Sequence, residues 1–158
     1  MPSHIIIFVE GDTDEVFFKA LIEYYKQVSS SPILPCSICN LKGVTRYSSK
    51  LLAKLKNEYI PEARNKRYCI KTICCSYDTD VFEIKNPLMV DWSSLAKSVK
   101  RLGIDGFSKL SDLYAKARRT YQKGYATREL IGALDFGRIV KARKEALAPL
   151  EATLGVTK

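Results

Sequence analysis

The sequence predicts an α/β fold with a short, mainly parallel sheet flanked by helices, plus a helical extension at the C-terminus. Three apolar runs support this prediction, at residues 4–9, 33–39 and 68–77. The first run has the β-branched and aromatic content of a strand buried on both faces, and the other two are further apolar runs of strand length. Helical patterns separate the runs, and crossover connections of that kind join parallel strands in a βαβαβ arrangement.

The first strand, residues 4–9, ends directly on Glu10 and Gly11, which indicates a tight turn. Apolar residues then recur at helical spacing over residues 13–27. Either Asp12 or Thr13 is suited to cap this helix, because both side chains accept a hydrogen bond from a free backbone N–H. A strand, a turn and an amphipathic helix are therefore expected in that order.

The middle of the chain repeats this order. A break at residues 29–32 precedes the second strand, a glycine turn follows at residues 40–43, and a helix is expected from Tyr47 to Pro61. The third strand, 68–77, again ends on acid, at Asp78.

The rest of the chain reads as mainly helical. Helices are expected at residues 92–101, 108–121 and 128–154, and residues 102–107 form a short strand or only a turn.

Composition favours one globular domain. The chain has 158 residues, 46% of them hydrophobic and 27% charged, which suits a packed core. We take residues 1–107 as the core and residues 108–158 as a basic helical extension packed on it. No apolar run has the length of a membrane span and the start lacks a basic leader, so a cytoplasmic protein without a membrane partner is expected.

Cysteine and histidine contribute little chemistry. Five cysteines are an odd number, so reduced core thiols are expected rather than disulfides. Cys36 and Cys39 form a CxxC motif, but Cys74 and Cys75 are adjacent and would point to opposite faces of a strand, which disfavours structural zinc. His4 is the only histidine, so a histidine-based triad or a histidine-rich metal site has little to draw on.

The positive charge lies mainly in the C-terminal part. The formal net charge is +9; residues 1–96 hold 12 Lys/Arg against 11 Asp/Glu, whereas residues 97–158 hold 14 against 6. A cationic surface beside an acidic site suits a polyanionic substrate, because neutralised phosphates release counterions. The alternative is an ordinary solvated helical surface.

Acidic residues follow two of the predicted strands. Glu10 ends the first, and Asp78 and Asp80 end the third. Functional groups of open α/β sheets collect at the carboxyl ends of the strands, and carboxylates there suit Mg²⁺ or Mn²⁺. The alternative is that each acid caps or salt-links a helix. We favour the metal site, because capping does not require the three acids to converge.

These segments resemble a known family. IIIFVEGDTDEVFFKAL is similar to the strand, Glu-Gly turn and helix start of the TOPRIM domain, ICCSYDTDVF resembles its Asp-x-Asp strand end, and CNLKGVTRYSSKLLAKL resembles the segment between them. The likeness covers residues 4–85 and is closest to stand-alone TOPRIM proteins and to the nuclease half of overcoming-lysogenization-defect proteins. The resemblance implies a TOPRIM-like Rossmannoid fold, whose fourth strand is poorly marked at residues 102–107.

The resemblance also implies roles for single residues. Glu10 would be the general acid/base or a metal ligand, Asp78 and Asp80 would bind Mg²⁺ or Mn²⁺, and Asp14 would assist a second ion. A lysine C-terminal to the Asp-x-Asp motif stabilises transition-state charge in the nuclease branch, and Lys123 is the candidate. Topoisomerase activity is disfavoured by the size of the chain, and primase activity by the lack of additional modules.

A second candidate region covers residues 115–128, where cations alternate with tyrosines. Cations there would neutralise phosphates and rings would stack on bases. The predicted nucleic-acid-binding residues are Lys116, Arg118, Arg119, Tyr121, Lys123 and Arg128. The alternative is a basic helix and loop whose tyrosines pack into the core.

The sequence thus predicts a metal-dependent nuclease, or a nuclease-like enzyme, acting on DNA or RNA. One alternative is a non-catalytic TOPRIM-like module that binds nucleic acid or a partner protein. Another is a helical interaction protein paired with an ATPase. Metal dependence of turnover separates the first from the second, and the oligomeric state is not encoded in any motif.

Overall fold

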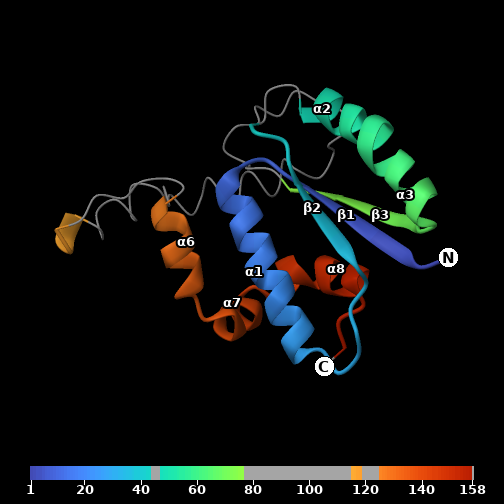
Figure 1. Ribbon diagram of the computed structural model, residues 1–158. Coiled ribbons are helices and arrows are strands. Elements are labelled where there is room, and N and C mark those ends of the chain that lie inside the picture. Colours follow the sequence, from blue (N-terminus) through green and yellow to red (C-terminus); the bar gives the residue numbers. More distant parts are fainter. Residues whose placement is uncertain (44–46, 77–114, 119–124, 158) are drawn as a thin grey trace.

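The protein has an α/β fold with a three-stranded parallel sheet in the order β2-β1-β3 (Figure 1). The computed structural model describes residues 1–43, 47–76, 115–118 and 125–157. The strands are β1 (Ser3–Val9), β2 (Cys36–Asn40) and β3 (Cys69–Cys75). The predicted βαβαβ order of parallel strands is confirmed, and the second strand begins later than predicted.

Strand β1 lies in the centre of the sheet and forms the core of the protein. Residues 5–9 are at most 1% exposed, as a strand covered on both faces requires. Val9 pairs with Asn40 on one side, and Phe8 pairs with Cys75 on the other. The three strands therefore end at the same edge.

One face of the sheet packs against α1 (Asp12–Val28) and the C-terminal helices α7 (Phe136–Ala142) and α8 (Lys144–Leu154). Ile5, Ile7 and Val9 share this cluster with Leu21, Tyr25, Val140 and Leu154. Ser30 N donates to Thr157 O at 2.8 Å, which joins the end of the chain to the end of α1. Residues more than a hundred positions apart thus form one hydrophobic core.

The other face is covered by a continuous helical segment (Figure 1). It consists of α2 (Tyr47–Lys54), the π-helical turn η1 (Leu55–Tyr59) and α3 (Ile60–Lys66). The prediction that this helix ends at Pro61 is wrong. Pro61 lies in the first turn of α3, after the π turn, where a missing N–H costs little.

Two other local predictions are also wrong. The N-cap of α1 is Gly11, not Asp12 or Thr13, and Gly11 N donates to Asp14 Oδ2 at 3.1 Å. Residues 128–154 are not one helix: α6 (Tyr125–Gly132) ends before α7, and Asp135 caps α7 by accepting from Arg138 N at 3.0 Å. The predicted elements at 92–101 and 102–107, and most of 108–121, lie outside the described residues.

The five cysteines are free thiols, as predicted, but Cys69 and Cys75 are exposed, so the prediction of core thiols is wrong for these two. Cys36 packs on the α1 face of the sheet, and Cys39 belongs to the cluster on the α2 face. Two thiols on opposite faces of a strand cannot share one zinc ion, because successive side chains along a strand alternate. Within the described ranges, none of the helices has the length and apolar content of a membrane span.

Candidate active site

Backbone hydrogen bonds hold the carboxyl ends of the three strands together. Ser76 N donates to Phe8 O at 2.8 Å, and Leu41 N donates to Val9 O at 2.9 Å. The buried hydroxyl of Tyr47 lies 3.0 Å from Phe8 O and 3.2 Å from Ser76 O. The end of β1 is therefore fixed to the residues that follow β2 and β3, as the strand-end argument requires.

Glu10 lies at this edge and is half-buried. Its carbonyl oxygen accepts a hydrogen bond from Gly43 N at 2.8 Å, so the turns after β1 and β2 are joined directly. Asp78 and Asp80 lie outside the described residues, and the description of β3 stops at Ser76. Their convergence with Glu10 remains a prediction.

Asp14 lies in the first turn of α1, where one carboxylate oxygen accepts from Gly11 N. This bond gives Asp14 a structural role at the start of the helix. The proposed contact with a second metal ion remains a prediction. Among the residues described, no three His, Cys, Asp or Glu side chains gather closely enough to hold a metal ion.

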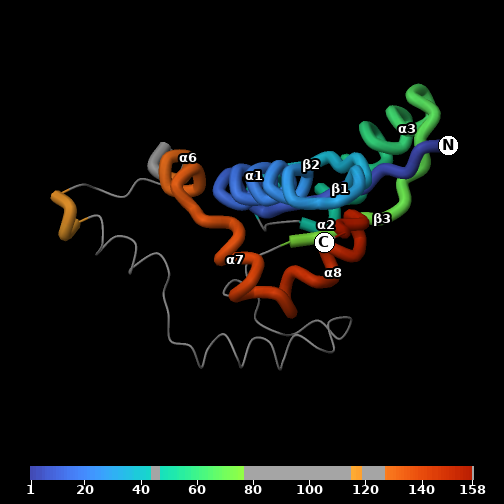
Figure 2. Tube along the Cα trace, turned by 90° about the horizontal axis from the view of Figure 1, so that it is seen from below, coloured from blue at the N-terminus to red at the C-terminus, as the bar shows by residue number. Residues whose placement is uncertain are grey.

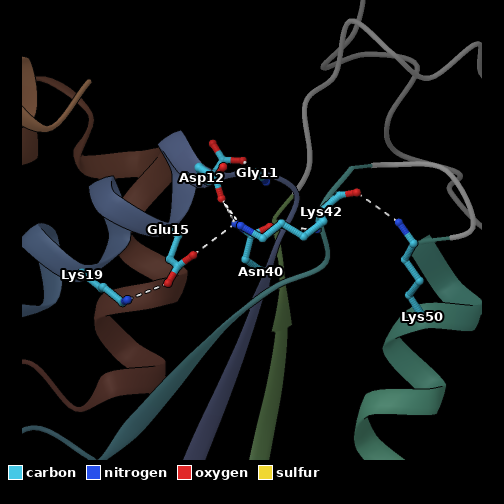
Figure 3. Close-up of polar contacts among 8 residues, drawn as sticks. Gly11, Asp12, Glu15, Lys19, Asn40, Lys42 and Lys50 are labelled. Atoms are coloured by element: carbon cyan, nitrogen blue, oxygen red, sulfur yellow. Dashed lines mark hydrogen bonds and ion pairs between the residues drawn. The ribbon is translucent and has the colours of Figure 1, made fainter. Parts of the chain in front are cut away.

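The same edge carries a polar cluster that the sequence analysis missed (Figure 3). Asn40, the last residue of β2, donates to Asp12 Oδ1 at 2.7 Å and to Glu15 Oε2 at 3.1 Å. Lys42 forms an ion pair with Asp12, and its backbone N–H donates to Asn40 Oδ1 at 2.8 Å. The cluster therefore joins the start of α1 to the turn after β2.

The turn after β2 has an unusual backbone. Lys42 and Gly43 both have positive φ, at 55° and 101°. Glycine adopts this region freely, whereas Lys42 is held there by the hydrogen bond to Asn40. Lys50, on α2, donates from Nζ to Leu41 O at 3.0 Å and to Lys42 O at 3.1 Å. The contacts of Lys42 and Lys50 therefore fix the turn that follows β2.

The cluster is ionised at neutral pH. The hydrogen bond and the charge of Lys42 hold the pKa of the Asp12 carboxyl below its ordinary value. Hydrogen bonds from Lys19 and Asn40 lower the pKa of Glu15. The same contact with Asp12 raises the pKa of Lys42. These groups therefore keep their charges when a polyanion approaches.

A simple signal identifies the missed residues. Asn40, Lys42 and Gly43 follow the second strand just as Glu10 and Gly11 follow the first. Functional groups of open α/β sheets collect at the carboxyl ends of the strands, and this holds for any polar residue as well as for acids. Asn40 and Lys42 meet this criterion.

The predicted nucleic-acid-binding residues separate into three groups. Arg128, on α6, lines a groove of about 810 Å³ together with Asp12, Glu15 and Lys42. Lys116 and Arg118 are exposed in a short segment that both views place away from the sheet (Figures 1 and 2). The third group, Arg119, Tyr121 and Lys123, lies outside the residues that the structure describes. Among the members of this set that the structure describes, Arg128 alone lines the groove at the polar cluster.

The ion pair between Lys42 and Asp12 yields a pH prediction. Lys42→Gln is expected to raise the pKa of Asp12 toward its ordinary value, because it removes the strongest hydrogen bond and the nearest positive charge. Since the pKa of Asp12 is lowered in the folded state, the pair stabilises the fold above the unfolded pKa. That stabilisation is lost as the pH falls through the folded pKa.

Carboxyl ¹³C NMR titration measures this shift. Lys66→Gln is the matched control, because it removes one lysine that pairs with Glu62 on α3. An Asp12 pKa that is the same in Lys42→Gln and in the wild type would contradict the described ion pair.

The fold and this edge define a class: a small α/β protein with a charged site at the carboxyl end of a parallel sheet. Comparisons of the chain with protein families, with characterised proteins and with solved structures found no match. The function of this protein is therefore inferred from the residues at the carboxyl edge of its sheet.

Proposed function

We propose that this chain is a TOPRIM-like, Mg²⁺- or Mn²⁺-dependent nuclease, or nuclease-like phosphodiesterase, that acts on DNA or RNA. The observation that carries the proposal is the hydrogen bond of 2.8 Å from Ser76 N to Phe8 O. It joins the ends of β1 and β3 two residues before Glu10 and two residues before Asp78. Asp78 and Asp80 would therefore follow β3 at the edge where Glu10 follows β1, and Glu10 would be their carboxylate partner on the neighbouring strand.

The donor atoms at this edge suit a hard cation. Glu10, Asp12, Asp14 and Asn40 all present oxygen atoms, which are the ligands that Mg²⁺ and Mn²⁺ prefer. Glu10, Asp78 and Asp80 would hold the ion, with Asp14 beside a second one. When bound, such an ion polarises a phosphodiester and lowers the pKa of a water molecule.

The side chains of the protein supply the remaining chemistry. Glu10, half-buried at the strand end, would accept a proton from the attacking water or return one to the leaving oxygen. Lys42 and Lys50, held at the turn after β2, would offset negative charge that builds up on the phosphate. Lys123 is the candidate that the sequence favours for this last role.

A cleavage assay tests the proposal. Labelled single-stranded and duplex DNA and RNA are incubated with the full chain in Mg²⁺, in Mn²⁺ or in EDTA. Cleavage is expected with either metal and not in EDTA. A chain that leaves every substrate intact in both metals is not a nuclease by itself.

One observation favours a second function, a non-catalytic binding module. Asp12 is already paired with Lys42, Glu15 is paired with Lys19, and Asp14 caps α1. Acids with such structural roles need no metal. A binding module would hold nucleic acid equally well in EDTA, whereas a protein partner such as an ATPase would copurify with the chain in a defined ratio.

A further inference from the structure

The bend between α7 and α8 carries a dense group of positive charges. Four of the seven residues from 138 to 144, which we call the elbow, are Lys or Arg, and none is acidic. They are Arg138, Lys141, Arg143 and Lys144. All four side chains are exposed. Figure 2 shows the two helices meeting at this bend.

The backbone of the elbow is anchored in the hydrophobic core. Phe136 lies against Phe17 and Tyr24, with ring centroids 5.7 Å and 6.1 Å apart. Val140 is buried one turn later, and Leu154 is fully buried at the end of α8. Arg138 and Lys141 are three positions apart on the opposite side of α7, so both point outward from a fixed helix.

The charges of the elbow are not neutralised locally. The ion pairs of the described residues involve lysines on α1, on α2 and α3, and in the turn after β2. Within those residues, no carboxylate lies within 4.0 Å of a cationic group of the elbow. Asp135, the nearest acid before it, accepts from the Arg138 backbone as the cap of α7. Glu145 follows the elbow directly, but no ion pair joins it to the elbow among the described residues, so the four cations are available to an external polyanion.

The side chains available indicate which polyanion fits. The elbow has no aromatic residue. Phe136, just before it, packs against Phe17 and Tyr24 and does not offer its ring for stacking on a base. Recognition of unpaired bases uses aromatic stacking, whereas the phosphate backbone is bound by cations alone. In a duplex the bases are already stacked on one another, so binding to its phosphate backbone needs no aromatic side chain.

We propose that the elbow is a sequence-independent binding surface for the phosphate backbone of double-stranded nucleic acid. The inference rests on the proposed function, in which this protein acts on nucleic acid. Helix α6, which precedes α7, carries Arg128 into the groove beside Asp12 and Lys42. The elbow therefore belongs to the same group of C-terminal helices as Arg128, which lines the groove at the candidate active site.

Binding of fluorescent duplex DNA and duplex RNA, measured by anisotropy in EDTA over a salt series, tests this surface. The elbow variant replaces four cations by glutamine: Arg138→Gln, Lys141→Gln, Arg143→Gln and Lys144→Gln. We expect at least a tenfold weaker affinity at about 0.1 M salt, because up to four phosphate contacts are lost. The slope of log K against log salt should fall by up to about 3.6, since each duplex phosphate contributes about 0.9.

The control variant removes the same charge from the other side of the sheet: Lys56→Gln, Arg64→Gln, Arg67→Gln and Lys71→Gln. These four residues are exposed and belong to no ion pair of the described residues. Thermal unfolding verifies that both variants fold. Equal losses in the two variants would show that net charge alone drives binding and would overturn the proposal. So would a wild type that binds no duplex, or one that binds polyglutamate or anionic vesicles more tightly.

This result is independent of catalysis. If binding in EDTA depends on the elbow but no cleavage occurs in Mg²⁺, the elbow proposal stands and the nuclease proposal fails. If the chain cleaves duplex and the elbow variant has an unchanged KM, the nuclease proposal stands and the elbow proposal fails.

Discussion

Glu10→Gln is expected to lower the rate of metal-dependent cleavage by at least about a hundredfold, the range for loss of a general acid or base. The amide has nearly the shape of the carboxylate but neither accepts a proton nor carries charge. The backbone contact from Gly43 N to Glu10 O does not involve the side chain and is expected to persist. Single-turnover cleavage of labelled substrate in Mg²⁺ measures the effect.

The double variant Asp78→Asn/Asp80→Asn is expected to be at least as impaired, because it removes the other predicted metal ligands. Glu58→Gln is the matched control. Glu58 is an exposed acid of η1 that pairs with Lys54, so its loss should leave cleavage unchanged. Full activity in Glu10→Gln would exclude the proposed site, even if the wild type is a nuclease.

Phe8→Ala has the largest expected effect on stability. It should lower the free energy of unfolding by about 3–5 kcal/mol, the usual cost of removing a buried phenyl ring and leaving a cavity. Phe8 is 0% exposed, and its ring contacts Tyr59 edge-to-face at 5.9 Å. Urea denaturation followed by circular dichroism gives the free energy.

Leu52→Ala is the control for this experiment. Leu52 lies on α2, which covers the same face of the sheet, but it is 63% exposed. Its truncation should change the free energy of unfolding by no more than about 0.5 kcal/mol. If Phe8→Ala cost as little as Leu52→Ala, the described packing of α2 and η1 against β1 would be wrong.

Much of the fold is predictable from local pattern. The uninterrupted apolar run before Glu10 predicts a strand buried on both faces, because only such a strand excludes polar residues from both sides. The long helical stretches between strands predict parallel pairing, because a tight turn cannot connect parallel strands. The place of Glu10 at a strand end follows from the same run.

Local pattern was a poor guide where distant contacts decide. Proline usually ends a helix, yet here the π turn before Pro61 lets the helical path continue into α3, on the side of the sheet that α2 covers (Figure 1). The residues of α7 and α8 share the core of β1, although composition shows only that this part is basic and helical. Packing against the sheet therefore overrides the local signals.

The candidate site divides in the same way. The sequence by itself determined where the strands lie, that they are parallel, and that an acid follows β1. These features depend on hydrophobic periodicity and on the length of the connections between strands. Only the tertiary structure revealed that Asn40 bridges Asp12 and Glu15, and that Lys42 pairs with Asp12 across 30 positions. Such contacts depend on the register of β1 against β2 and on the path of each turn. Neither is encoded by the residues near Asp12, because the partners meet only once the sheet has formed.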